Sequence, residues 1–141
     1  MPMRLLLFFY LTALAAGAAT ISELDRVRKA VCRIAVTRLR ANYAEPWKPG
    51  NMNSGTGSGF LIEGRRIMTN AHVVSDARLI VVSKEGDPNR YPAKIEYIAH
   101  DCDLAILQVQ HPQFYRGMQA LEFGDLPQLD SAVAACGYPI G

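Results

Sequence analysis

Two side chains in this sequence could perform acid–base chemistry together. His72 lies within Thr-Asn-Ala-His-Val-Val at 69–74, and Asp103 opens Asp-Leu-Ala-Ile-Leu at 103–107. A neutral imidazole takes a hydroxyl proton near pH 7 and can return it to a leaving amine. A carboxylate on the other ring nitrogen would select the tautomer and stabilise the imidazolium. The pair would therefore serve as the base and the orienting acid of an enzyme with a nucleophile.

Each of the two residues also has a structural interpretation. A lone histidine is more often structural than catalytic, and Asp103 could be a solvated turn residue. The small and β-branched residues around His72 are expected to place its ring on a short turn between strands. Asp103 precedes an apolar strand, where a carboxylate is tolerated only when it is hydrogen-bonded or paired. For that reason Asp103 is preferred to its neighbour Asp101.

The elements that must position this pair are short strands separated by glycine and proline. Apolar and polar residues alternate along several segments, as expected for half-buried strands. A short helix is expected at 21–29, and a loop at 42–53 would use Trp47 as an anchor on the barrel surface. Such a pattern predicts an all-β fold, an antiparallel barrel or sandwich. The expected strands cover 31–37, 60–62, 66–69, 79–83, 91–100, 104–109 and 131–138.

Three glycines alternate through Ser-Gly-Thr-Gly-Ser-Gly at 54–59. A phosphate-binding loop is the alternative interpretation, but the spacing is wrong and no Gly-Lys-Ser/Thr follows. Glycine before a strand allows two backbones to pass closely and an edge of a barrel to bend. We therefore assign these glycines to the construction of the barrel.

Composition and charge exclude several classes of protein. Half of the 141 residues are apolar and the net charge is only +2, so the sequence does not predict nucleic-acid binding. A metal site from His72, His100, His111 and Asp101 lacks any known ligand spacing, and no cofactor is expected.

The three cysteines lie outside any Cys-x-x-Cys pair. Cys32, Cys102 and Cys136 each sit in an apolar, strand-like setting, which favours small buried core residues. One disulfide is possible in an oxidising compartment, and the sequence does not select the pair.

Residues 1–19 have the pattern of a signal peptide. Arg4 precedes an apolar run at 5–14, and Ala-Gly-Ala at 16–18 offers a cleavage site. The run is short for a membrane span. Cleavage would leave a chain with no stable membrane insertion, exported to the periplasm or the extracellular space. An uncleaved membrane anchor or a buried helix is the alternative.

Four motifs occur in an order that resembles the Deg/HtrA group of trypsin-like serine endopeptidases. They are Gly-Ser-Gly-Phe-Leu-Ile at 57–62, Ile-Met-Thr-Asn-Ala-His-Val-Val at 67–74, Asp-Leu-Ala-Ile-Leu at 103–107 and Gly-Tyr-Pro-Ile-Gly at 137–141. The stretch Leu-Glu-Phe-Gly-Asp-Leu-Pro at 121–127 is similar to the plant-type Deg proteases. Each motif is weak alone, whereas four in order make a specific signal.

The resemblance implies the chymotrypsin-like fold of two barrels, with His72 as the general base and Asp103 as its orienting acid. The expected domains are the N-terminal barrel at 20–130 and the start of the second barrel at 131–141. In that family the second barrel supplies the serine and the oxyanion hole. None of the following five serines has the matching context: Ser54, Ser58, Ser75, Ser83 and Ser131.

We therefore expect an N-terminal portion of a protease that is inactive alone. The resemblance implies unfolded or damaged polypeptides as substrates and allows a homo-oligomer. The alternative is a non-catalytic β-barrel binding module or pseudo-protease.

Overall fold

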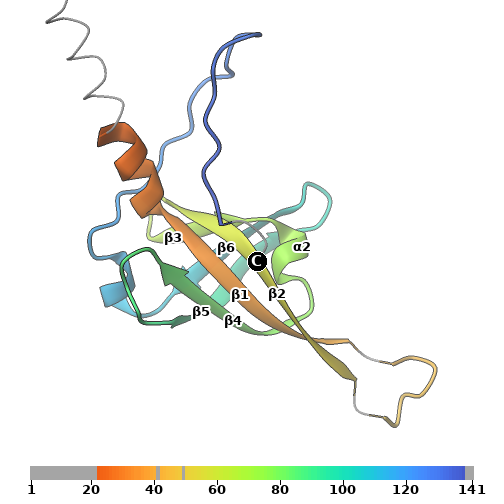
Figure 1. Cartoon of the computed structure of the whole chain (residues 1–141). Coiled ribbons are helices and arrows are strands. Elements are labelled where there is room, and N and C mark those ends of the chain that lie inside the picture. Colours follow the sequence, from red (N-terminus) through yellow and green to blue (C-terminus); the bar gives the residue numbers. More distant parts are fainter. Residues whose placement is uncertain (1–21, 41, 49, 139–141) are drawn as a thin grey trace, which may run out of the picture.

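The computed structural model describes residues 22–40, 42–48 and 50–138, and its centre is a closed antiparallel barrel with strand order β1-β2-β3-β6-β5-β4 (Figure 1). A helix over 22–30 leads into the barrel. The strands and short helices are β1 (Val31–Arg40), β2 (Asn51–Ile62), β3 (Arg66–Thr69), α2 (Ala71–Val74), β4 (Ala77–Lys84), β5 (Tyr91–Ala99), β6 (Leu104–Val109) and the 3-10 helix η1 (Pro112–Tyr115).

The all-β fold expected from the alternating pattern is confirmed, and of the two forms left open, barrel or sandwich, the structure has the barrel that the resemblance implies. In β1 the inward positions Cys32, Ile34 and Val36 are all nearly inaccessible, and in β6 Leu107 and Val109 point into the same core. Alternate side chains of a strand point to opposite faces, so one face of each strand fills the barrel. The two strands next to the site, β3 and β6, have the bounds that the sequence predicts.

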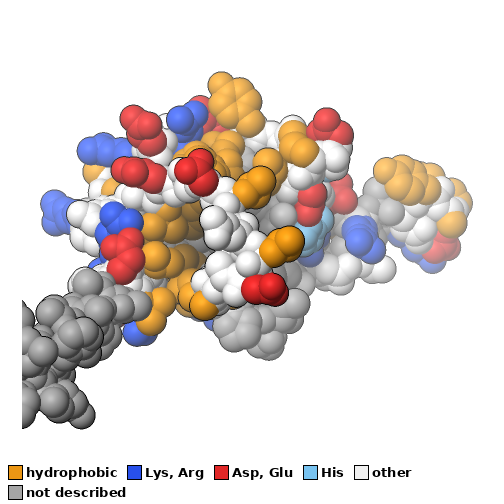
Figure 2. All heavy atoms as spheres, turned by 90° about the horizontal axis from the view of Figure 1, so that it is seen from above, with side chains coloured by type: hydrophobic (Ala, Val, Ile, Leu, Met, Phe, Trp, Pro, Cys, Tyr) orange, Lys and Arg blue, Asp and Glu red, His pale blue; other side chains and the backbone are white. Residues whose placement is uncertain are grey.

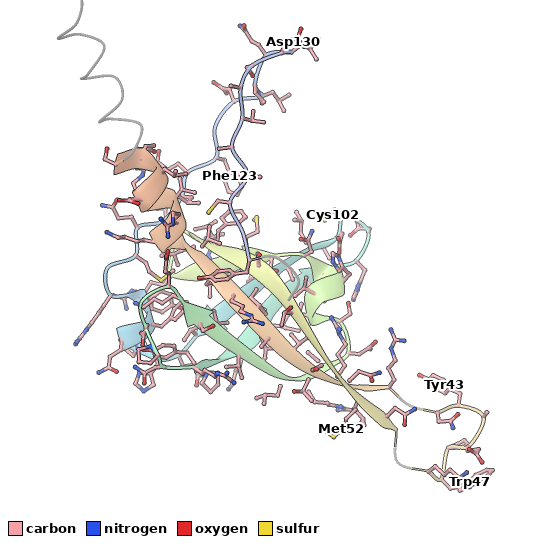
Figure 3. All side chains as sticks on the ribbon, in the orientation of Figure 1. Tyr43, Trp47, Met52, Cys102, Phe123 and Asp130 are labelled. Atoms are coloured by element: carbon pink, nitrogen blue, oxygen red, sulfur yellow. The ribbon has the colours of Figure 1, made fainter. Side chains whose placement is uncertain are left out.

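The β1–β2 hairpin extends well past the barrel as an arm, and the arm carries Trp47 at its tip (Figure 3). Trp47 is 77% exposed and Tyr43 is 90% exposed. The prediction that Trp47 anchors the loop on the barrel surface is therefore wrong. The two strands pair with each other as far as Arg40 and Asn51, which carries the connecting loop away from the barrel wall.

The alternating glycines lie inside β2 rather than ahead of it. A Cβ on Gly59 would lie 2.8 Å from both Ile34 Cδ1 and Ile67 Cγ2. Separations this short would force the core side chains to move, so glycine is required where β2 passes over the packed interior. At each of the three glycines an added Cβ would meet a packed side chain.

Strand β5 does not keep the alternation predicted for 91–100. Its pairing with β6 shifts register between Ile95 and Tyr97, and Tyr97 is 64% exposed. A bulge reverses the faces of the residues that follow it, which the residue pattern alone does not reveal.

Residues 121–138 rise from the barrel and return to it as an extended excursion (Figure 1). The departing end is held by Leu121 N–H, which donates to Leu61 O at 2.8 Å, and the returning end by Tyr138 N–H, which donates to Ser58 Oγ at 2.8 Å. The strand predicted for 131–138 is not observed, because no neighbouring strand pairs with these described residues. A strand needs a hydrogen-bonded partner to form.

The excursion leaves apolar side chains in solvent. Phe123, Leu126, Leu129 and Val133 are between 72% and 97% exposed. Viewed from above, apolar side chains gather over the middle of this face of the molecule, with charged ones around them (Figure 2). An exposed apolar surface of this kind favours association.

The cysteine prediction holds only for Cys32. Cys102 is exposed on the turn before β6 (Figure 3). Cys136 is also exposed, and all three cysteines are free. Burial in the core raises the pKa of the Cys32 thiol to about 12.

The signal peptide predicted for 1–19 lies outside the described residues. Within the described ranges, no helix has the length and apolar character that a membrane crossing requires. The same part of the chain contains no cluster of three or more histidine, cysteine or acidic side chains that could hold a metal ion.

Candidate active site

The β3–β6 ladder brings the two predicted residues together. Thr69 pairs with Ala105 at the end of this antiparallel pair. Ala71 lies two residues after Thr69, and Asp103 lies two residues before Ala105. The backbone N–H of Ala71 donates to Asp103 O at 3.1 Å. The ladder therefore continues past β3 and sets the start of α2 against the residue that opens β6.

His72 and Asp103 form a hydrogen-bonded pair at this point. His72 Nδ1 lies 2.7 Å from Asp103 Oδ2, and the backbone N–H of His72 donates to Asp103 Oδ1 at 2.8 Å. Both carboxylate oxygens are thus engaged by one residue. The His72 side chain is 71% exposed, so the rest of its ring is open to solvent. No described hydrogen bond joins Asp101, the competing carboxylate, to His72.

Asn70 also binds Asp103. Its side-chain amide donates to Asp103 Oδ2 and to Asp103 O, both at 3.2 Å. Asp103 itself has a φ of 54°, a left-handed conformation that aspartate adopts more readily than most residues. The backbone N–H and then the ring of His72 hold the pKa of the Asp103 carboxyl below its usual value. Asp103 is therefore ionised at neutral pH.

The single turn of α2 fixes the position and orientation of the His72 side chain. Ala71, Val73 and Val74 are buried and leave His72 as the exposed residue of the turn. A Cβ on Gly57 would lie 2.7 Å from Val73 Cγ1, so the missing side chain lets α2 approach β2. The predicted turn between strands is thus a helical turn packed on β2.

Two further residues support the pair, Asn70 and Arg38, and neither was predicted from the sequence. Asn70 lies two residues before His72 in the same motif, but the sequence alone did not predict a role for it. Arg38 lies far from the motif in the sequence, and its guanidinium donates to carbonyl oxygens of α2 and the residue after it. No local pattern marks such an arginine.

A mostly apolar hollow of about 320 Å³ adjoins the pair on the side of β2 and β3. Its lining includes Asn70, which binds the Asp103 carboxylate, and Leu104, the residue after Asp103, but neither His72 nor Asp103 itself. It also includes Ser58, whose hydroxyl accepts from Tyr138 N–H. The chemical groups of the site therefore comprise one imidazole, one oriented carboxylate and an apolar depression beside them.

Comparison with known proteins identifies the class. A profile of the trypsin-like peptidase domain matches residues 57–141. The chain therefore belongs to the trypsin-like peptidase family. Its relatives are Deg/HtrA proteases, which confirms the group that the motifs resemble.

Two relatives from Arabidopsis thaliana illustrate the similarity. The mitochondrial protease Do-like 4 is 39% identical over 90% of this chain and 24% of its own length, and the putative mitochondrial protease Do-like 3 is 38% identical over 86% and 22%. The DegP serine protease homologue of Plasmodium falciparum is 42% identical over 80% of this chain and 13% of its own. The chain thus spans about a quarter or less of these relatives.

Solved structures agree on the fold. The active form of the Rv3671c protease from M. tuberculosis superposes with a TM-score of 0.58 at 25% identity, covering 74% of this chain and 39% of that one. The HtrA-type protease AlgWS227A with a tripeptide gives 0.55 at 20% identity over 72% and 28%. The barrel described above is therefore shared with trypsin-like proteases.

Proposed function

We propose that His72 and Asp103 are the general base and orienting acid of a serine-type endopeptidase, of which this chain forms the first barrel. The observation that carries the proposal is the 2.7 Å contact between His72 Nδ1 and Asp103 Oδ2, with the carboxylate held at both oxygens. Geometry of this kind is what defines the pair in unrelated proteases.

The chemistry follows from the tautomer. With Nδ1–H donated to Asp103, the exposed Nε2 of His72 carries the lone pair. It takes the proton of a serine hydroxyl as the oxygen attacks a peptide carbonyl, and later gives that proton to the leaving amine. Asp103 stays ionised because its pKa is lowered, and it stabilises the imidazolium that forms in between.

The nucleophile is proposed to come from outside residues 1–141. Ser58 Oγ is hydrogen-bonded to the backbone of Tyr138, and Ser75 Oγ donates to Ala71 O at 2.7 Å, so each has a structural partner. Removing the serine from a protease of this mechanism costs about 10⁶ in turnover. The 141-residue chain by itself is therefore expected to be inactive.

Two measurements test this assignment. The first is to sequence the source DNA past codon 141, where a reading frame that continues into Gly-Asn-Ser-Gly-Gly is expected. The second is peptide hydrolysis by the purified chain, where no activity sensitive to a fluorophosphonate is expected. A stop codon directly after Gly141 would favour the alternative of a non-catalytic binding module or pseudo-protease.

Substrates, assembly and location are further parts of the proposal. We propose unfolded or damaged polypeptides as substrates, a homo-oligomer as the working form and export to the periplasm or extracellular space. The leader at 1–19 supports export, because its apolar run follows one arginine. Several relatives are named mitochondrial or chloroplastic. Fusing residues 1–20 to a reporter separates export, with cleavage near Ala18, from import into an organelle.

A further inference from the structure

We infer that Arg38 is a positioning residue for His72: its guanidinium binds two carbonyl oxygens of α2 and that of the next residue, Ser75, and so keeps the His72 ring on Asp103. The inference rests on the proposed function for its catalytic meaning. The contacts between Arg38 and α2 do not depend on the proposed function, because they are contacts among described residues.

The contacts converge on one end of the turn. Arg38 Nη2 donates to Val73 O at 2.7 Å and to His72 O at 3.1 Å, and Nε donates to Ser75 O at 3.2 Å. The last carbonyls of a helix have no partner within it, and α2 is only four residues long. A planar guanidinium with several fixed donors suits such a cluster better than an ammonium group does.

The position of Arg38 on β1 brings its side chain to the C-terminal end of α2. The β1–β4 pairing shifts register between Thr37 and Arg38, where the arm begins to leave the barrel. On the neighbouring strand, Gly55 makes room: a Cβ there would lie 2.5 Å from Arg38 Nη1. Figure 1 shows α2 beside β2 near the root of the arm, and the two elements are in contact.

The same turn carries both bonds from His72 to Asp103. The backbone N–H of His72 binds Oδ1 and its ring binds Oδ2, so a shift of α2 weakens both together. The other attachments of α2 are its buried side chains and the bond from Ala71 N–H to Asp103 O at 3.1 Å. Ser75 closes the turn, since its N–H and hydroxyl both bond to Ala71 O. Arg38 is the attachment that acts on the carbonyl of His72 itself.

The experiment compares variants of the 141-residue chain by proton NMR after ¹⁵N labelling of histidine. The low-field Nδ1–H signal of His72, assigned by its loss in His72→Gln, reports the bond to Asp103. We expect Arg38→Met to raise the solvent exchange rate of this proton about tenfold or more, since a hydrogen bond to a charged group is lost. Arg38→Lys should restore part of the protection, because it keeps the charge and some of the donors.

Gly55→Ala is the second variant and leaves Arg38 in place. The new methyl group displaces the guanidinium, and the flexible side chain can move, so the fold should survive with faster exchange of the same proton. Arg40→Met is the matched control, an exposed arginine two residues along β1 that makes none of the bonds to α2. It should leave the exchange rate unchanged.

The variant Asp103→Asn distinguishes a failure of the role of Arg38 from a failure of the proposed function. If Asp103→Asn removes the protected signal while Arg38→Met and Gly55→Ala leave it unchanged in folded protein, the role of Arg38 is refuted and the proposed function stands. If Asp103→Asn itself has no effect, the pair is absent in solution and the proposed function fails.

Discussion

Ala71 and Asp103 are joined by a backbone hydrogen bond of 3.1 Å that lies beyond the last paired residues of β3 and β6. This bond extends the ladder to the turn that carries His72. The relative position of the imidazole and the carboxylate is therefore set by strand register and not by flexible loops. Sites built on strands and helices are held more closely than sites on loops.

Replacing Asp103 by asparagine should disable catalysis without unfolding the barrel. Asparagine keeps the shape but loses the charge, and it favours the wrong imidazole tautomer, so turnover of the complete protease is expected to fall by about 10⁴. The measurement is kcat for a peptide substrate. The matched control is Asp101→Asn on the same turn, and an equal loss in the control would contradict the assignment of Asp103.

Stability should depend on acid pH through Asp103. A carboxyl whose pKa is lower in the folded chain stabilises the fold above its unfolded pKa of 3.8, and this stabilisation is lost as the pH falls through the lower folded value. The wild-type Tm should therefore exceed that of Asp103→Asn at pH 7 and approach it by about pH 2. Thermal unfolding followed by circular dichroism tests this convergence.

Asp87 supplies a comparison for that titration. Its carboxylate accepts from Asn89 N–H and from the Tyr91 hydroxyl, and the pKa of Asp87 is also lowered. Asp87→Asn should also weaken the dependence of Tm on pH in the acid range. In the double variant Asp87→Asn/Asp103→Asn, Tm should depend on pH less than in either single variant. Parallel curves for wild type and Asp103→Asn would show that the His72 bonds do not persist in solution.

Adding a methyl group at Gly57 should push α2 off β2. The new Cβ would lie 2.7 and 2.8 Å from the two γ-carbons of Val73, and overpacking of this kind costs about 1–3 kcal/mol. Urea unfolding measures the loss in Gly57→Ala. Because Val73→Ala removes the opposing carbons, the double variant should be less destabilised than the sum of the two single variants.

Gly124→Ala is the control for that series. Gly124 has nothing within 4 Å of an added Cβ, so its change in unfolding free energy should stay within about 0.5 kcal/mol. Additive losses for Gly57 and Val73 would refute their direct contact.

The cysteines should divide into two reactive and one protected. Cys102 and Cys136 are exposed, whereas Cys32 is buried with a pKa of about 12. The thiolate is the reacting species, so a disulfide reagent at pH 8 should titrate two thiols in the folded chain and three in denaturant. Rapid reaction of all three without denaturant would contradict the buried position of Cys32.

Exposed apolar residues of the excursion should make the isolated chain associate. Leu126 and Leu129 are 95% and 97% exposed, and neither supports the barrel. Replacing both by serine should lower the binding of a hydrophobic dye and the concentration dependence of sedimentation while leaving the Tm unchanged. A fall of several degrees in Tm would show that these side chains pack in solution.

The sequence by itself determined the all-β class, the family and most of the strands, because alternation and the motif order are local; the strand predicted for 131–138 is the exception. It also selected His72 and Asp103, whose catalytic role stays a prediction. The tertiary structure decided the rest. Barrel closure set the register that joins His72 to Asp103, the fold brought Arg38 of β1 to the carbonyl oxygens of α2, and the arm carried Trp47 into solvent. These relationships link residues far apart in the chain, and long-range register leaves no periodic trace in sequence.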